Sequence, residues 1–150
     1  MLNQQKVISN KNLFNMYNKE IVMNKRNIIL LIDDNPINLK ISSIQLKDLG
    51  FNDIVIAKNA LEALELMDES ISLVLLDIGL PDINGLDLCT MLRKKVNYKK
   101  LPIIAVTAFT DNIHEKCTLA DIDDVINKPV DMNILSATLI NNLVISKDNE

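Results

Sequence analysis

Polar side chains that suit phosphoryl chemistry follow four of the five short apolar runs in this sequence. They are three carboxylates, one hydroxyl and one ammonium: Asp33, Asp34, Asp77, Thr107 and Lys128. Three neighbouring carboxylates stay ionised only if a cation compensates them, and a partly hydrated, all-oxygen site suits Mg²⁺. Because Mg²⁺ bridges carboxylate and phosphate oxygens, the set predicts a phosphoryl site. There Lys128 pairs with a phosphate oxygen, Thr107 donates a hydrogen bond, and one carboxylate could itself be the nucleophile.

The apolar runs themselves are rich in Val, Ile and Leu and lack polar alternation, which is typical of strands buried on both faces of a sheet. Segments with helical spacing alternate with them, at about residues 35–50, 59–69, 85–96, 111–120 and 131–146. The predicted strands are Ile28–Ile32, Ile54–Ala57, Leu73–Leu76, Ile103–Val106 and Val125–Ile126.

This alternation predicts an α/β fold with a doubly wound, five-stranded parallel sheet and helices on both faces. In the flavodoxin-like (βα)5 arrangement, strand order 2-1-3-4-5, the first and third strands meet at the point where ligands bind. Asp33, Asp34 and Asp77 follow these two strands. Each acid alone would be an ordinary strand-end or helix-cap residue, but their joint placement indicates one cleft.

The first predicted helix opens at Asn35-Pro36, a cap residue followed by proline at the first helical position. Its apolar spacing predicts a buried face, made of Ile37, Ile41, Ile44 and Leu49. Because Ile41 and Ile44 already supply a buried stripe, Ile37 or Leu39, beside the acidic cleft, is a candidate for docking a helical-bundle partner. The alternative is that Ile37 simply packs inward.

Composition excludes several classes of function. The 150 residues carry a net charge of −4 and only one histidine, which argues against electrostatic nucleic-acid binding and against a His-rich metal site. The apolar runs are far shorter than a membrane span, and no secretory signal is recognisable. Two cysteines, Cys89 and Cys117, suit a reducing compartment. We therefore expect a cytoplasmic protein with no direct nucleic-acid or membrane partner.

The domain organisation predicted from the sequence is simple. Residues 1–26 are rich in Asn and Lys and form an extension, either loosely ordered or a short helix. Residues 27–146 form one domain, and residues 147–150 form a tail.

Four stretches that contain the polar cluster resemble the receiver domain of two-component response regulators. They occur in the family's order and spacing and cover about residues 27–146: IILLIDDNPIN from Ile28, LVLLDIGLPDING from Leu73, PIIAVTA from Pro102 and DDVINKPV from Asp123. The residues around Asp34 and Asp77 are similar to those of receivers in hybrid sensor kinases and phosphorelays. Our leading interpretation is a stand-alone receiver that accepts and relays a phosphoryl group.

The resemblance implies a role for each acid in binding Mg²⁺. Asp34 matches the direct metal ligand, and Asp33 matches the acid that acts through water. Asp77 matches the phosphoacceptor, which also ligates the metal, and Gly79 occupies the position whose backbone carbonyl completes the metal shell.

The resemblance also implies how the phosphoryl group is held and sensed. Thr107 matches the hydroxyl that follows the phosphoryl group, and Lys128 matches the phosphate-pairing lysine, whose bond to proline is cis in the family. Two positions depart from the family pattern. Val125 replaces the switch aromatic, which puts the usual signalling route in doubt, and Asp121 replaces a common glycine.

The implied function is to take a phosphoryl group onto Asp77 from a histidine kinase or a histidine-containing phosphotransfer protein. The implied catalysis is limited to self-phosphorylation and self-dephosphorylation. One alternative is an aspartate-nucleophile phosphatase of haloacid-dehalogenase type, but those enzymes carry a second Asp two residues after the nucleophile, where this chain has Gly79. The other alternative is a receiver-like interaction module that is never phosphorylated.

Overall fold

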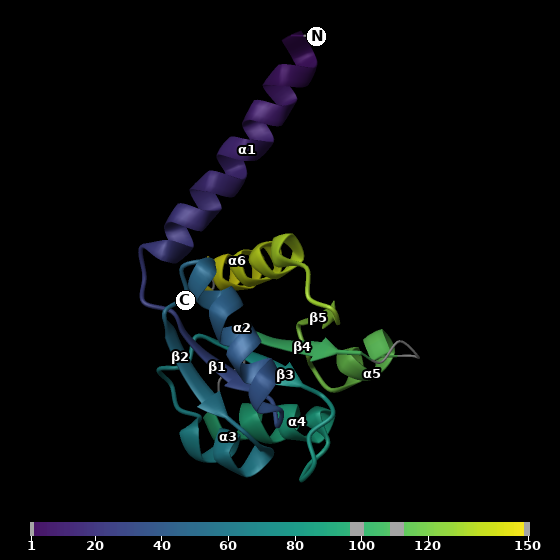
Figure 1. Cartoon of the computed structure of the whole chain (residues 1–150). Helices are drawn as coiled ribbons and strands as arrows, with labels where there is room; N and C mark the ends of the chain where they lie inside the picture. Colours follow the sequence, from purple (N-terminus) through teal and green to yellow (C-terminus); the bar gives the residue numbers. More distant parts are fainter. Residues whose placement is uncertain (1, 97–100, 109–112, 149–150) are drawn as a thin grey trace.

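The central element of the computed structural model is a five-stranded, fully parallel sheet in the order β2-β1-β3-β4-β5. The structure describes residues 2–96, 101–108 and 113–148. The strand order and the doubly wound fold are those predicted (Figure 1). The strands are β1 Ile28–Ile32, β2 Asp53–Ala57, β3 Leu73–Asp77, β4 Ile103–Thr107 and β5 Asp124–Asn127.

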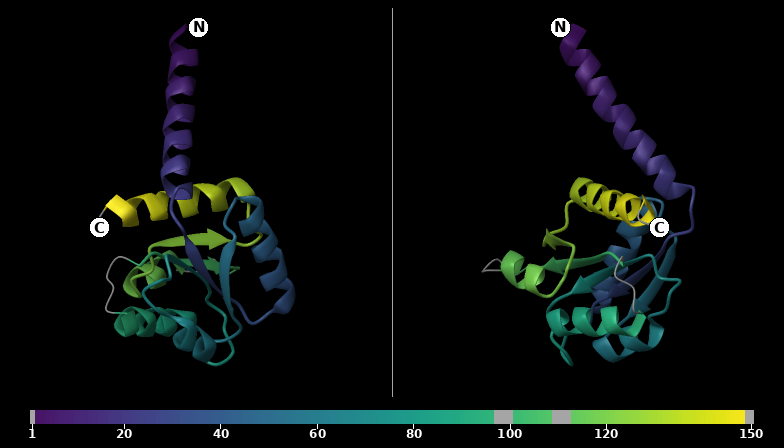
Figure 2. Two further views of the ribbon diagram at one scale, coloured as in Figure 1. Left: turned by 90° about the vertical axis from the view of Figure 1, so that its left-hand side faces the viewer. Right: turned by 180° about the vertical axis from the view of Figure 1, so that it is seen from behind.

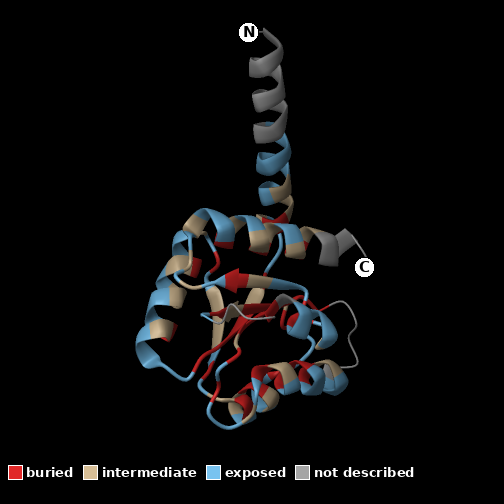
Figure 3. Cartoon of the chain, turned by 90° about the vertical axis from the view of Figure 1, so that its right-hand side faces the viewer, coloured by how far each residue is buried: buried red, intermediate tan, exposed pale blue. Residues whose placement is uncertain are grey.

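Two layers of helices cover the sheet, one on each face (Figures 1 and 2). The helices are α1 Leu2–Met23, α2 Pro36–Asp48, α3 Ala60–Leu66, α4 Gly85–Val96, α5 Ile113–Leu119 and α6 Met132–Asp148. The core has two parts: α3, α4 and α5 pack on one face of the sheet, whereas α2, α6 and the end of α1 pack on the other. The central strands β1, β3 and β4 are buried between these layers (Figure 3), as their apolar runs predicted, whereas the edge strands β2 and β5 are only partly buried.

The N-terminal extension is helical over a greater length than predicted. α1 spans 22 residues and projects from the domain, with its last turn beside α6 (Figure 2). Val22 is buried there, whereas Leu13, Phe14 and Tyr17 are exposed. At the other end, α6 continues to Asp148, so part of the predicted tail is helical. No helix in the described ranges is long and apolar enough to cross a membrane.

The predicted buried face of the first helix is wrong for its three isoleucines, whereas Leu49, which follows the helix, packs against the core as predicted. α2 begins as predicted, with the Asn35 side chain accepting hydrogen bonds from the backbone N–H groups of Ile37 and Asn38. Its buried residues, however, are Leu39 and Leu46. Its outer face exposes three isoleucines that were expected in the buried face: Ile37, Ile41 and Ile44. For Ile37, this exposure agrees with the docking role considered above and not with inward packing. Leu39, only 5% exposed, is therefore excluded as a docking residue in this conformation.

Arg93 ties α4 to the turn before β5. Its guanidinium donates to the backbone carbonyls of Asp121 and Leu101 and pairs with the Asp123 carboxylate at 2.9 Å. Asp121 adopts a left-handed backbone conformation, with φ of 62°, which accounts for the frequent glycine at this position in the family. The Arg93 side chain is only 12% exposed, whereas the side chain of its partner Asp123 is 39% exposed.

We expect Arg93→Met to lower the free energy of unfolding by about 2 kcal/mol, because the buried carbonyl of Leu101 loses a charged donor. Lys94→Met, at an exposed position of the same helix, is the matched control. Urea unfolding followed by circular dichroism measures both variants. Equal stabilities for the two would contradict this role of Arg93.

Two glycines face different surroundings. A Cβ at Gly85 would lie 2.6 Å from Ile78 Cα, closer than the backbone permits. Gly50 ends α2 with φ of 98°, and a Cβ there would meet only the flexible end of Met23, at 3.5 Å. Gly85 is thus required by close packing of two backbones, whereas Gly50 is favoured by its conformation.

Candidate functional site

The three acids predicted from the sequence converge at the carboxyl ends of β1 and β3. One carboxylate oxygen from each of Asp33, Asp34 and Asp77 lies within 4.8 Å of the other two. β1 and β3 are hydrogen-bonded neighbours, with Ile32 opposite Leu76, so the residues that follow them emerge side by side. The donor set is all oxygen and strongly anionic, which fits a small, hard divalent cation such as Mg²⁺.

The three carboxylates differ in their surroundings. Asp33 is buried, Asp77 is half-buried and Asp34 is exposed. Burial raises the pKa of Asp33, and the neighbouring Asp77 charge adds to the effect, although the backbone N–H of Asn35 donates to Asp33 and opposes it. Because the ionised form of Asp33 is disfavoured by burial and by the neighbouring carboxylate, a bound cation would stabilise that form.

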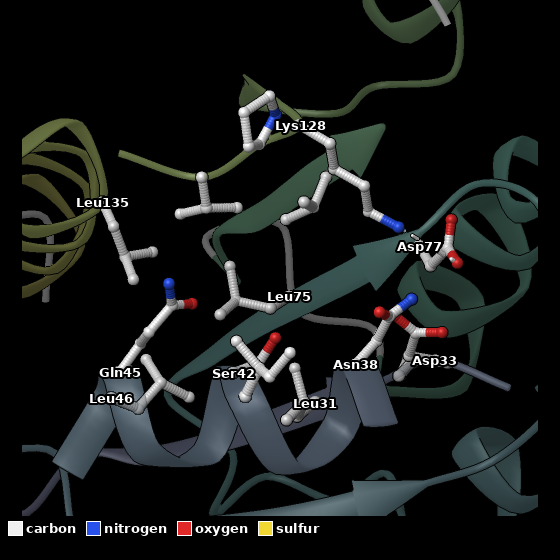
Figure 4. A pocket seen from close by; sticks show the side chains of 15 residues that line it. Leu31, Asp33, Asn38, Ser42, Gln45, Leu46, Leu75, Asp77, Lys128 and Leu135 are labelled. Carbon is white, nitrogen blue, oxygen red and sulfur yellow. Dashed lines mark ion pairs between the residues drawn. The ribbon is translucent and has the colours of Figure 1, made fainter. Parts of the chain in front are cut away.

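Lys128 extends from the end of β5 toward the acids. Its Nζ lies 3.7 Å from Asp77 Oδ2 (Figure 4), and its backbone N–H donates to the carbonyl of Thr107 at 2.9 Å. The Lys128-Pro129 peptide bond is cis, as the family resemblance implied. This ammonium is therefore placed to pair with an anion attached to Asp77.

Thr107 ends β4, next to the strand that carries Asp77. Val106 is paired with Asp77 in the sheet, and Thr107 is the following residue, paired with Asn127 on β5. The Thr107 side chain is buried. The structure therefore brings the predicted hydroxyl-bearing residue to the same edge of the sheet as the acids.

Gly79 and Val125, the remaining predicted site positions, differ in what they contact. The Gly79 backbone N–H donates to Asp77 Oδ1 at 3.1 Å, which fixes the start of the loop after β3. Gly79 as a carbonyl ligand to a metal stays a prediction. Val125, at the predicted switch position, is half-buried and packs against the core on the α3–α5 side of the sheet.

A cavity of about 300 Å³ opens beside the acids, between α2 and the segment that joins β5 to α6 (Figure 4). Its wall near the site includes Asp33, Asp77 and Lys128, and the wall away from the acids is largely aliphatic, with Leu46 and Leu135 (Figure 4). The phosphoacceptor candidate is therefore reached from a cleft rather than from a flat surface, as expected at a topological switch point.

Removing the Asp33 charge is expected to stabilise the metal-free protein. A carboxyl whose pKa is raised by folding contributes stability below its unfolded pKa and loses it as the pH rises through the folded value. In EDTA at pH 7, Asp33→Asn should therefore have a higher melting temperature than wild type, and this gap in melting temperature should narrow as the pH falls toward 4. Asp87→Asn, exposed on α4, is the control. A gap that does not depend on pH would contradict the prediction.

One acid outside the acidic cluster was not singled out from the sequence. Asp82 lies in the loop after Asp77, and its carboxylate accepts hydrogen bonds from the backbone N–H groups of Ala60 and Leu61. Local spacing gave no signal for this contact, because the partners are more than 20 residues apart. Only the placement of α3 against the loop reveals it.

The fold and the site together define a class: a doubly wound parallel α/β protein with an acidic cleft, a hydroxyl and a lysine at the carboxyl ends of its strands. The family model described as the response regulator receiver domain matches residues 29–140. The chain belongs to this family of receiver domains in two-component signalling. Neither alternative function, a dehalogenase-type phosphatase or a receiver-like module that is not phosphorylated, is favoured.

Curated relatives place similar domains in both large and small proteins. The chain is 38% identical over 113 residues to the hybrid signal transduction protein dokA of Dictyostelium discoideum, and 34% identical over 113 residues to the aerobic respiration control sensor protein ArcB of Escherichia coli. Each match covers 74% of this chain, but only 7% of dokA and 14% of ArcB. The polar-differentiation response regulator DivK of Brucella anthropi is 32% identical, and the match covers 68% of this chain and 84% of DivK.

Solved structures agree with the fold. A CheY-like receiver domain from Methanospirillum hungatei superposes with a TM-score of 0.75 at 26% identity, covering 84% of this chain and all of that one. A two-component response regulator from Clostridium difficile gives a TM-score of 0.70 at 28% identity, covering 78% and 95%. The flavodoxin-like architecture is thus shared with known receivers.

Proposed function

We propose that Asp77 accepts a phosphoryl group from a phosphohistidine donor. A carboxylate oxygen of Asp77 attacks the phosphorus, the bond from phosphorus to the imidazole nitrogen breaks, and the imidazole leaves as a neutral ring once it has taken up a proton. The product is an acyl phosphate on Asp77. The observation that carries the proposal is the Lys128 ammonium, 3.7 Å from Asp77 at the edge where three carboxylates meet.

In this proposal the acids hold Mg²⁺ while the other side chains hold the phosphoryl group. Asp34 and Asp77 would bind the ion directly, Asp33 through water, and the ion would neutralise charge on the transferred oxygens. Lys128 would exchange its ion pair with Asp77 for one with a phosphoryl oxygen, and the Thr107 hydroxyl would donate to another. Intact-mass spectrometry of the chain after incubation with phosphoramidate and Mg²⁺ tests the proposal.

A histidine kinase or a histidine-containing phosphotransfer domain is the partner that we propose, located with this chain in the cytoplasm. The partner is supported by the relatives, which include hybrid signal transduction proteins. The location is supported by the two cysteines, which are both buried free thiols. The docking surface that we propose is the outer face of α2. Ile37, Ile41 and Ile44 are at least half exposed there, and their spacing of four and three residues puts them on one side of the helix.

We expect Ile37→Asp to slow phosphotransfer from the purified cognate partner about tenfold, the loss expected when about 1.4 kcal/mol of interface energy is removed. Ile37 is 68% exposed, so the fold should tolerate the change. Leu119→Asp, at an exposed position on α5, is the matched control. Labelling by phosphoramidate should stay at the wild-type rate in both variants, and transfer to Ile37→Asp at the wild-type rate would exclude this docking surface.

A further inference from the structure

Asp82 connects the loop that follows the phosphoacceptor candidate to a different element of the fold. Its Oδ1 accepts from the backbone N–H of Ala60 at 3.1 Å, and its Oδ2 accepts from that of Leu61 at 3.2 Å. Oδ1 also accepts from Ile83 at 3.0 Å, within the loop itself. Both oxygens of one carboxylate are therefore used to join this loop to the first residues of α3.

The start of α3 would be incompletely capped without this carboxylate. The Asn59 side chain accepts from the N–H of Glu62 at 2.8 Å, which leaves the N–H groups of Ala60 and Leu61 to Asp82. A negative charge at the amino end of a helix is favourable, because these N–H groups lack intrahelical partners and the helix dipole is positive there. The interaction therefore has two effects: it caps the start of α3, and it fixes the loop that carries Asp82 against this helix.

The base of the same loop is held by a second, independent contact. The Gly85 N–H donates to the carbonyl of Ile78 at 3.1 Å, where the two backbones are in close contact. Gly79 lies between this base and Asp82, and its N–H donates to Asp77. The loop is thus held at its base by the contact between Ile78 and Gly85 and near its middle by Asp82, and Gly79, the proposed carbonyl ligand to Mg²⁺, lies between these two anchors in the sequence.

We propose that Asp82 is a positioning residue for cation binding. By anchoring the loop to α3, Asp82 holds the Gly79 backbone in place beside Asp77. The carbonyl ligand is then preorganised, and binding of the ion does not have to order the loop first. This inference rests on the proposed function of the acidic cleft. Asp82 itself touches neither the ion nor the phosphoryl group in this arrangement.

The test is a calorimetric titration of the full, unphosphorylated chain with Mg²⁺. Removing a residue that orients metal ligands commonly costs 10- to 100-fold in affinity. Because Asp82 does not contact the Gly79 carbonyl but anchors the loop that carries it, we expect a smaller effect: Asp82→Ala should raise the Kd for Mg²⁺ about 3- to 10-fold. Asp82→Asn keeps one acceptor oxygen, so its Kd for Mg²⁺ should lie between those of Asp82→Ala and wild type. Thermal melts verify that each variant is folded.

Two control variants separate anchoring from other effects. Asn59→Ala removes the other cap of α3 and should lower stability without changing the Kd for Mg²⁺. Asp87→Asn removes one negative charge from the exposed start of α4 and measures the purely electrostatic contribution. A folded Asp82→Ala that binds Mg²⁺ like wild type would overturn the inference, as would an equal rise in Kd in either control. Absence of Mg²⁺ binding by wild type would overturn the proposed function as well.

Discussion

Asp77→Asn is expected to abolish covalent labelling by phosphoramidate. In the presence of Mg²⁺ the wild-type chain should gain the mass of one phosphoryl group, because Asp77 is the half-buried carboxylate that faces Lys128 across the cleft. An amide in its place has no anionic oxygen to attack phosphorus, while its size is nearly the same. Intact-mass spectrometry with time resolves the gain and its decay by hydrolysis.

The choice of variants makes this result specific. Asp34→Asn keeps the nucleophile and should slow labelling without moving it to another residue. Asp82→Asn should retain labelling on Asp77. If the Asp77→Asn chain still gained a phosphoryl group, the nucleophile would be a different residue, and peptide mapping after borohydride trapping would identify it.

Asp34→Ala is expected to weaken Mg²⁺ binding by at least about tenfold, since loss of even an outer-shell partner commonly costs that much. Asp34 is the exposed member of the three acids, so its removal should leave the fold intact. Lys128→Ala is the informative comparison. It removes a positive charge that lies 3.7 Å from Asp77, so Mg²⁺ binding should stay unchanged or become tighter.

The two variants should also differ in what they do to phosphorylation. Asp34→Ala should be rescued in part by raising the Mg²⁺ concentration, whereas Lys128→Ala should stay impaired at any concentration, because its partner is the phosphoryl group. Weaker Mg²⁺ binding in Lys128→Ala would contradict the division of roles proposed for this cleft. Calorimetry and labelling rates on the same samples make the comparison.

The sheet and the acidic cluster were predictable because both follow from strong local signals. Uninterrupted runs of branched aliphatic residues mark strands that are buried on both faces, and connection rules then fix where the strand ends meet. Asp33 and Asp77 therefore had to converge once their strands were recognised. The same reasoning predicts Lys128 at this edge of the sheet, because it follows β5.

The buried face of α2 was not predictable in the same way. Apolar residues occupy two stripes of this helix, and spacing alone does not tell which one faces the sheet. The isoleucines at 37, 41 and 44 repeat more regularly than Leu39 and Leu46, yet the leucines are the buried pair. The contact of Asp82 with α3 was inaccessible for a different reason: it depends on tertiary placement, which no local pattern encodes.

The different surroundings of the two glycines have a consequence for tolerance to random mutagenesis. In a saturation library, position 50 should show a graded response, because a side chain there costs about 1–2 kcal/mol of backbone strain and Asn reduces that cost. Position 85 should accept glycine alone, because even alanine would place a carbon 2.6 Å from the Ile78 backbone. Selection for signalling in such a library would therefore register residue 85 as invariant although it carries no functional group.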